Sequence, residues 1–168
     1  MENLLRKVPL FKEFTEQELA ELIQLGYQQD LAKGEIVFRE NDPGDSFYMI
    51  IAGAVEIWAE KINQVLRKME AGDFFGELSL MLGIPRTATV KCLEDCTFFV
   101  FNREGLQKLL AANKLLADSI PEKLNEYVEE ITYRKELLRE AGLLEDEESF
   151  DSQPVTWIRQ QIKAQIGI

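Results

Sequence analysis

The chain has 168 residues, of which 46% are hydrophobic, and its 30 acidic and 19 basic residues give a net charge of −11. The length and apolar content suit one folded domain with its own core, and the acidity argues against a nucleic-acid partner, because phosphate backbones are bound by basic surfaces. The chain contains no histidine, the commonest general base and metal ligand, so we expect neither an enzyme nor a metal site.

Targeting signals are not evident in the sequence. No run of about eighteen apolar residues occurs, and the N-terminus MENLLRKVPLFKEF lacks the continuous apolar stretch and the cleavage site of a signal peptide. We therefore expect a cytoplasmic protein that does not insert directly into a membrane.

The first thirty residues are predicted to be helical. In the stretch FTEQELAELIQLG, apolar residues recur at near-helical spacing. Thr15 followed by Glu18 has the spacing of a capping box, and Gly26 is a plausible stop signal. The sequence therefore predicts an N-terminal helical segment over residues 1–30.

From about residue 31 the period of the apolar residues changes from near 3.6 to near 2. Short segments rich in β-branched and aromatic residues alternate with turn signals that contain glycine, proline, asparagine or aspartate. Strands that recur every eight to twelve residues or so are typical of a sandwich or a jelly roll. The segments are EIVFRE, SFYMIIAG, AVEIWAE, QVLRKME and TATVKCLEDCTFFVFN. We therefore predict a mainly β domain over residues 31–117.

Two cysteines, Cys92 and Cys96, flank a predicted turn. Their spacing leaves a disulfide conceivable, but reduced, partly buried thiols are the better interpretation in a cytoplasmic protein. Two cysteines without histidine also fall short of a zinc site.

The pattern becomes helical again after about residue 102. REGLQKLLAANKLLADS is amphipathic, and Pro121 is expected to open a second helix that ends near Gly142. We assign 118–142 to this helix and 143–168 to an acidic linker with a short amphipathic helix. Between residues 118 and 151 there are 12 acidic and 4 basic residues, a net charge of −8.

The stretch FFGELSLMLGIPRTATV, residues 74–90, contains the most specific motif. Gly76 can adopt a positive φ or let the backbone approach a ligand. Arg86 follows Glu77 by nine residues, so one cation and one carboxylate belong to the same loop. Such a loop could hold a phosphate and a sugar hydroxyl together, and the alternative is a turn with a surface arginine.

This stretch resembles the phosphate-binding cassette of the cyclic-nucleotide-binding domain family, which includes catabolite-activator-like and kinase-regulatory-subunit-like sensor domains. The upstream segment KGEIVFRENDPGDSFYMIIAGAVEI is similar to the early strands of that family. The resemblance covers residues 8–140 and implies a jelly-roll β-barrel flanked by helices. The cassette match consists of Phe75-Gly76-Glu77-Leu78, Gly83-x-Pro85-Arg86 and Thr87-Ala88-Thr89-Val90.

The resemblance implies particular roles for these residues. Arg86 would bind the cyclic phosphate, Glu77 would accept a hydrogen bond from the ribose 2′-hydroxyl, and Thr87 would add a hydroxyl near the phosphate. The helix that follows the barrel would close over the base. The implied ligand-binding set is Gly76, Glu77, Leu78, Ser79, Arg86, Thr87 and Ala88, and the implied lid residues are Tyr127, Ile131 and Arg134.

Three functions remain open at this point. The first is a sensor of cAMP, or alternatively of cGMP, that transmits binding as a movement of its C-terminal helix. The second is a degenerate member of the family that serves as an interaction or dimerisation module. The third, an enzyme on a jelly-roll scaffold, fits poorly without histidine or metal ligands, and we predict neither a catalytic residue nor a cofactor. The retained Glu77 and Arg86 favour the sensor, whose output would be a homodimer or an effector protein.

Overall fold

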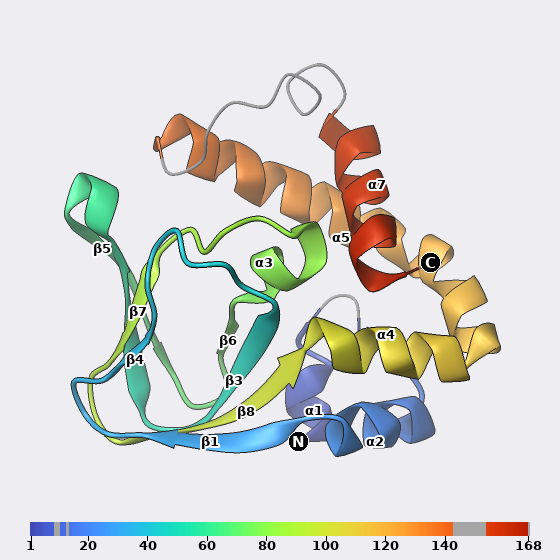
Figure 1. Cartoon of the computed structure of the whole chain (residues 1–168), viewed down its shortest axis with the longest axis horizontal. Coiled ribbons are helices and arrows are strands. Elements are labelled where there is room, and N and C mark those ends of the chain that lie inside the picture. The colour runs from blue at the N-terminus through green and yellow to red at the C-terminus, as the bar shows by residue number, and fades with distance from the viewer. Residues whose placement is uncertain (9–10, 13, 143–153, 168) are drawn as a thin grey trace. The chain divides into compact units, whose positions relative to one another are not determined.

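The computed structural model describes residues 1–8, 11–12, 14–142 and 154–167 (Figure 1). The chain divides into two compact units. The sheet unit comprises Gly26–Asn102, and the helical unit comprises Met1–Leu25 together with Arg103–Ile168. The helical unit is therefore assembled from both ends of the sequence.

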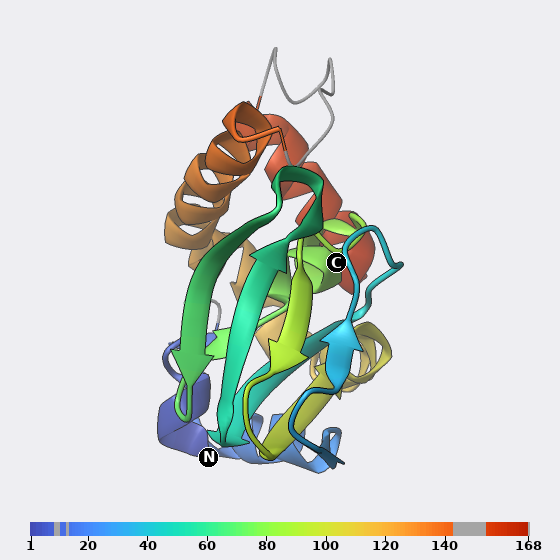
Figure 2. The ribbon, with the colours of Figure 1, turned by 90° about the vertical axis from the view of Figure 1, so that its left-hand side faces the viewer.

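The sheet unit is built from strands that form two four-stranded sheets, in the orders β1-β8-β3-β6 and β2-β7-β4-β5. The strand pairings are antiparallel, and the second sheet faces the viewer in Figure 2. This arrangement agrees with the predicted antiparallel sandwich or jelly roll. The strands are β1 (Tyr27–Leu31), β2 (Ile36–Phe38), β3 (Ser46–Ala52), β4 (Ala54–Ala59), β5 (Gln64–Glu70), β6 (Phe74–Phe75), β7 (Thr89–Cys92) and β8 (Cys96–Asn102), with a 3₁₀ turn η2 (Glu60–Ile62) and a short helix α3 (Glu77–Leu82).

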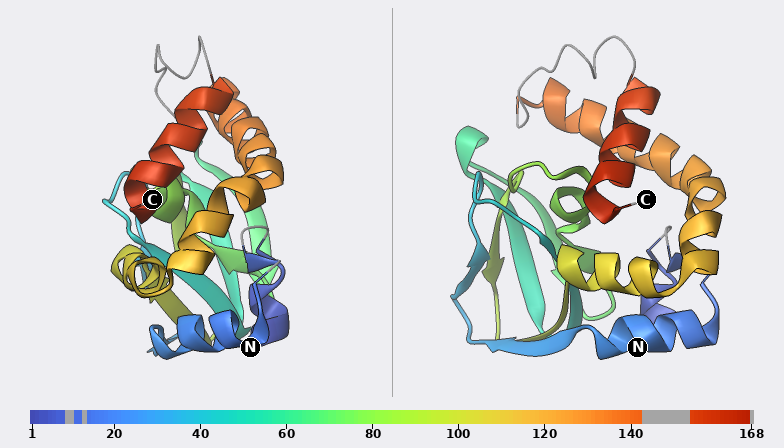
Figure 3. Two further views of the ribbon diagram at one scale, coloured as in Figure 1. Left: turned by 90° about the vertical axis from the view of Figure 1, so that its right-hand side faces the viewer. Right: turned by 45° about the vertical axis from the view of Figure 1, so that its right-hand side comes forward.

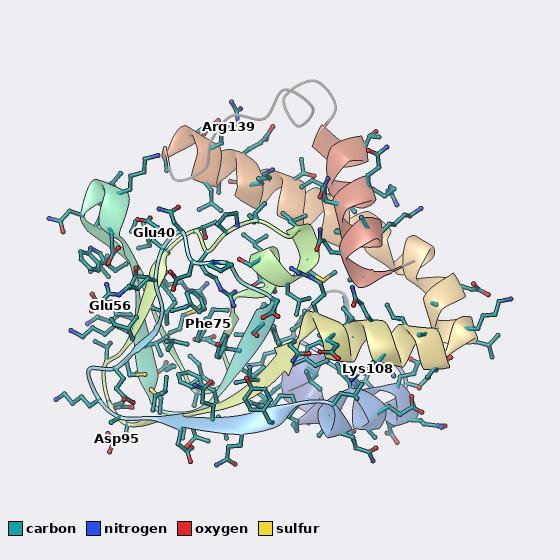
Figure 4. All side chains as sticks on the ribbon, in the orientation of Figure 1. Glu40, Glu56, Phe75, Asp95, Lys108 and Arg139 are labelled. Carbon is teal, nitrogen blue, oxygen red and sulfur yellow. The ribbon has the colours of Figure 1, made fainter. Side chains whose placement is uncertain are left out.

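Side chains from both sheets form the core of the sheet unit. Ile50 and Val55 from one hairpin and Phe98 and Val100 from β8 are fully buried. Phe75 of β6 belongs to the same cluster, and its side chain is labelled in Figure 4. Burial of a side chain such as Phe98 contributes about 1.5–3 kcal/mol. The loop between β6 and β7 is therefore anchored at both ends in a packed core.

The β region begins earlier than the sequence pattern suggested. The sequence pattern assigns residues 27–30 to the N-terminal helical segment, but they form most of β1, with Tyr27 opposite Val100 and Leu31 opposite Cys96. A Cβ at Gly26 would overlap the ring of Phe99, so a glycine is required where the chain leaves the helix. Pairing with a strand about seventy residues away decides the conformation here, and a local pattern does not contain that information.

The helical unit includes α1 (Glu2–Leu5), α2 (Glu16–Gln24), α4 (Arg103–Ala112), α5 (Lys114–Glu140) and α7 (Pro154–Ile166) (Figure 3). The predicted capping box at the start of α2 is confirmed: Thr15 Oγ1 accepts from the Glu18 N–H at 3.2 Å, and Glu18 Oε2 accepts from the Thr15 N–H at 2.8 Å. The amphipathic character predicted for the last helix is also confirmed, since Ile158, Ile162 and Ile166 are fully buried. None of the described helices combines the length and the apolar composition of a membrane-crossing segment.

The long helix α5 starts at Lys114, four residues before the assigned range 118–142 and seven before Pro121. The sequence pattern placed a new helix at Pro121, whereas α5 runs from Lys114 and contains Pro121 in its interior. Asn113 supplies the stronger start signal, because its side-chain oxygen accepts a hydrogen bond from the Leu116 N–H at 3.0 Å. A proline within a helix removes one backbone hydrogen bond and favours a bend. The ribbon of α5 changes direction along its length (Figure 3).

Candidate functional site

The predicted cassette connects β6 to β7 and contains the six-residue helix α3. Gly76 precedes this helix with φ of +86°, and Gly83 follows it with φ of +68°. Other residues rarely adopt this left-handed conformation, so the two glycines fix where the helix begins and ends. The cassette is thus a loop of defined shape.

Arg86 is the central residue of the site. Its side chain is buried, and the whole residue is 5% exposed. Nη1 donates to the Gly76 carbonyl at 2.9 Å, and Nη2 donates to the Ser46 carbonyl at 2.8 Å. The guanidinium therefore joins the start of the cassette to the start of β3. The alternative of a surface arginine on a turn is wrong, because this arginine is buried.

The segment between β2 and β3 lies against the backbone of Arg86. The Arg86 N–H donates to the Asp42 carbonyl at 2.8 Å, and the Asn41 N–H donates to the Arg86 carbonyl at 2.8 Å. Thr89 Oγ1 accepts from the Glu40 N–H at 3.0 Å and ties the same segment to β7. These bonds fix the backbone from which the Arg86 side chain extends.

Aromatic rings surround the Arg86 side chain. Its Cζ lies 4.0 Å from the centroid of the Phe38 ring and 5.9 Å from that of Tyr48. Tyr48 in turn stacks on Phe75, with ring centroids 5.2 Å apart and an interplanar angle of 3°. Burial raises the pKa of Tyr48 above its ordinary value of 10.0, although the positive charge of Arg86 acts in the opposite direction. Tyr48 is therefore a neutral phenol at physiological pH.

The other predicted ligand-binding residues lie close to this arginine in the sequence and in the fold. Glu77, Leu78 and Ser79 form the first part of α3, and each is less than 9% exposed. Ala88 is buried and Thr87 is half-buried in the chain that leads from Arg86 into β7. The backbone of Gly76 contacts this arginine directly, because its carbonyl accepts from Arg86 Nη1.

The predicted lid residues Tyr127, Ile131 and Arg134 belong to α5. Their side chains lie outside the described residues, so their role stays a prediction.

Sequence reasoning missed several residues that surround Arg86. Phe38 and Ser46 have no local signal that points to an arginine 48 or 40 positions away in the chain. Gly44 lies in the upstream segment that resembles the family, but nothing in that segment indicates that it lies against the Arg86 side chain. Contacts of this kind depend on strand pairing, which brings β2 beside β7 and β3 beside β6.

The described residues offer neither a metal-binding cluster nor a reactive thiol. Among the described residues, no group of three or more His, Cys, Asp or Glu side chains is placed to hold a metal ion. Cys92 and Cys96 are both buried and are not joined in a disulfide, as predicted. Burial, together with the neighbouring Cys96 thiol, raises the pKa of Cys92 to about 12. A thiol with so high a pKa is a poor nucleophile at neutral pH.

Related proteins match both the sequence and the fold. A family model described as the cyclic nucleotide-binding domain matches residues 28–113. A protein of Rhodopseudomonas palustris with a provisional potassium-channel name is 32% identical over 142 residues, which cover 84% of this chain and 34% of that protein. The cAMP-dependent protein kinase regulatory subunit of Pyricularia oryzae is 32% identical over 109 residues, or 65% of this chain and 28% of that protein. The chain thus spans about a third of the length of these relatives.

Solved structures show the same fold. The N-terminal domain of a transcriptional regulator from Streptomyces coelicolor matches with a TM-score of 0.67 and 27% identity, over 76% of this chain and 94% of that one. The regulatory domain of Toxoplasma gondii PKA, solved with cAMP, matches with a TM-score of 0.59 and 26% identity, over 64% of this chain and 42% of that one. The predicted fold class, a jelly roll with flanking helices, is thereby confirmed. With a family model that covers more than half of its residues, a matching fold and the cassette in its expected place, the chain belongs to the cyclic nucleotide-binding domain family.

Proposed function

We propose that this chain is a regulatory domain that binds a 3′,5′-cyclic nucleotide, with cAMP as its ligand, and that binding changes the position or order of α5. The observation that carries the proposal is the buried Arg86, held at the cassette by the Gly76 and Ser46 carbonyls. The bonds to these two carbonyl oxygens orient the guanidinium. A guanidinium fork in a fixed orientation suits two oxygens of one phosphate.

Hydrogen bonds to the phosphate alone do not account for micromolar affinity. A charge-assisted hydrogen bond contributes about 1.5–3 kcal/mol, whereas micromolar binding requires about 8 kcal/mol. The remainder must come from other polar contacts and from burial of the base. We assign the polar contacts to the predicted set, with Glu77 on the ribose 2′-hydroxyl and Thr87 near the phosphate. A closing α5, through Tyr127, Ile131 and Arg134, would cover the base.

Relatives support cAMP as the ligand. The matching fungal kinase subunits are named for cAMP, and the Toxoplasma gondii regulatory domain was solved with cAMP. Thr87 does not decide the base, because the family resemblance places a threonine there in both cAMP- and cGMP-responsive members. Calorimetric titration of the folded chain with each nucleotide tests the preference. We expect tighter binding of cAMP, and at least tenfold tighter binding of cGMP would overturn this choice.

The same titration tests the second candidate function. If neither nucleotide binds a chain whose circular dichroism and thermal unfolding show that it is folded, the sensor proposal fails. The degenerate interaction or dimerisation module would then be the better reading. Because the chain spans about a third of the relatives named above, its output can lie in a homodimer, in an effector protein or in a longer polypeptide.

A further inference from the structure

We propose that Phe38 and Gly44 are positioning residues for Arg86: together they hold its guanidinium in the orientation that receives the phosphate. The inference rests on the proposed function, since it concerns the same ligand. Neither residue belongs to the ligand-binding set predicted from the sequence, and both precede the cassette by at least thirty residues.

Phe38 is the last residue of β2, and its half-buried ring packs against the core of the sheet unit. The Cζ atom of Arg86 lies 4.0 Å from the centroid of this ring. At that distance the negative face of the ring attracts the cation, and the attraction is larger where water is excluded. Arg86 is 5% exposed, so this contact is largely shielded from water.

Phe38 is itself held in place by other rings. Its centroid lies 5.7 Å from that of Tyr48 and 5.8 Å from that of Phe75. Tyr48 and Phe75 stack on each other, and both meet Phe98 edge to face. The ring under the guanidinium is therefore part of a packed aromatic cluster, which limits how far Arg86 can tilt.

Gly44 supports the arginine through its lack of a side chain. A Cβ at this position would lie 2.6 Å from Arg86 Cζ and 2.7 Å from its Cδ, and closer still to Nε. The backbone of Gly44 therefore lies against the arginine side chain, and any larger residue would displace it. The bonds to the Gly76 and Ser46 carbonyls direct the two Nη atoms, while Phe38 and Gly44 restrict the rest of the side chain.

This arrangement orders the arginine before the ligand arrives. A free arginine side chain loses much rotamer freedom when it is fixed by a ligand. A side chain already held in its binding orientation avoids that loss, so preorganisation raises affinity. A merely structural Phe38 would lower the stability of the protein on replacement but would leave the affinity of the folded protein unchanged.

The affinity test uses three variants of the full chain and cAMP as the titrant. Phe38→Leu keeps apolar bulk and removes the ring, and we expect it to weaken cAMP binding by about five- to thirtyfold. Phe38→Tyr keeps an aromatic ring under the guanidinium, so the attraction between ring and cation is retained. Its affinity for cAMP should therefore lie within about threefold of that of the parent chain. Phe14→Leu is the matched control, because it removes a buried ring that packs edge to face on Phe11 in the helical unit, outside the cassette, and we expect unchanged affinity.

Gly44→Ala provides an independent variant. It should weaken cAMP binding at least tenfold, because its Cβ displaces the arginine. Gly34→Ala is the control for backbone strain: Gly34 has φ of +88° and nothing within 4 Å of an added Cβ. It should lower the thermal midpoint without changing the affinity of the folded protein.

A second measurement needs no ligand. Arginine side-chain NMR of the chain without nucleotide reports the Arg86 Nε–H resonance, identified by its loss in Arg86→Lys. The Phe38 ring should displace this resonance, and Phe38→Leu should return it toward the values of exposed arginines, whereas Phe14→Leu should leave it in place. If the parent chain binds no cyclic nucleotide, the proposed function fails. This measurement still tests whether the Phe38 ring holds the Arg86 guanidinium in place. If the parent binds cAMP and Phe38→Leu binds it equally well, with an unchanged Nε–H resonance, the inference is wrong and the proposed function stands.

Discussion

Arg86 has a structural role and a proposed binding role in the same place. Its guanidinium bridges the Ser46 and Gly76 carbonyls, so its loss removes two hydrogen bonds inside the sheet unit. Each such bond contributes about 0.5–1.5 kcal/mol, or somewhat more where one partner is charged. A test of binding must therefore separate the folded fraction from the affinity of the folded protein.

Replacement of Arg86 by alanine should weaken cyclic-nucleotide binding by one to two orders of magnitude, which corresponds to about 1.5–3 kcal/mol. Calorimetry on protein shown to be folded at the working temperature measures this. Arg39→Ala is the matched control: it removes an exposed arginine whose ion pair with Glu60 is 3.2 Å long. The control should keep its affinity, and unchanged affinity in folded Arg86→Ala would refute the assignment of the phosphate site.

The raised pKa of Cys92 predicts that the free energy of unfolding depends on pH. Its pKa is about 12 in the folded chain against 9.0 in the unfolded chain. Above about pH 9 the unfolded chain loses this proton first, so the free energy of unfolding should fall as pH rises and should not depend on this thiol below pH 9. The slope approaches about 1.4 kcal/mol per pH unit.

Urea unfolding between pH 7.5 and 10 measures that slope. Cys92→Ala should show a flatter profile above pH 9, although its stability is lower throughout because a buried side chain is shortened. The raised pKa of Tyr48 also lowers the free energy of unfolding, but only above about pH 10, where this phenol begins to ionise in the unfolded chain. Equal slopes in the parent and the variant would show that Cys92 does not stay protonated in the folded chain.

Among the helices and strands, local patterns predicted best where the information is local. The capping box at Thr15 and the turn between β7 and β8 depend on residues within a few positions, and both occur as predicted. The same reasoning failed at β1, because the conformation of this strand depends on pairing with β8. It also failed at Pro121, because Asn113 caps a helix that starts at Lys114, seven residues before that proline. Element boundaries set by distant partners cannot be read from a short window.

The candidate site divides in the same way. The residues from Gly76 to Ala88 are contiguous in the sequence, and the resemblance of this one stretch to a family identifies them. The other residues of the site are not identified in this way, because Phe38, Gly44 and Ser46 reach Arg86 only after the strands pair. Side-chain packing between strands has no signature in spacing or composition.

The cap on α2 gives a test of helix stability. Thr15→Ala removes the hydroxyl that accepts from the Glu18 N–H, and we expect a loss of about 0.5–2 kcal/mol in the free energy of unfolding. Gln17→Ala is the control, since Gln17 is exposed in the same helix and its side-chain amide donates to Glu21 Oε1 over a long 3.4 Å. Its effect should stay within about 0.5 kcal/mol. Equal urea midpoints for Thr15→Ala and the parent would contradict the importance of the cap.

The whole molecule contains a sheet unit that carries the cassette and a helical unit that carries α5. A regulatory domain needs a second element whose state differs between free and bound protein. A ligand shifts such an equilibrium only if it binds one state better than the other. If α5 covers the base in the bound state, burial of apolar surface supplies that difference.

Amide hydrogen exchange tests this proposal across the whole chain. Saturating cAMP should slow exchange both in residues 74–90 and in residues 121–141, which comprise most of α5 and its C-cap, because an ordered or newly packed helix opens less often. Arg86→Ala at the same cAMP concentration, which is too low to saturate the weakened site, is the control and should show a smaller change in both regions. It separates an effect of the bound nucleotide from an effect of cAMP in solution. Protection confined to residues 74–90 would leave a binding pocket without an output through α5. The switch mechanism would then have to be abandoned, while nucleotide binding itself would stand.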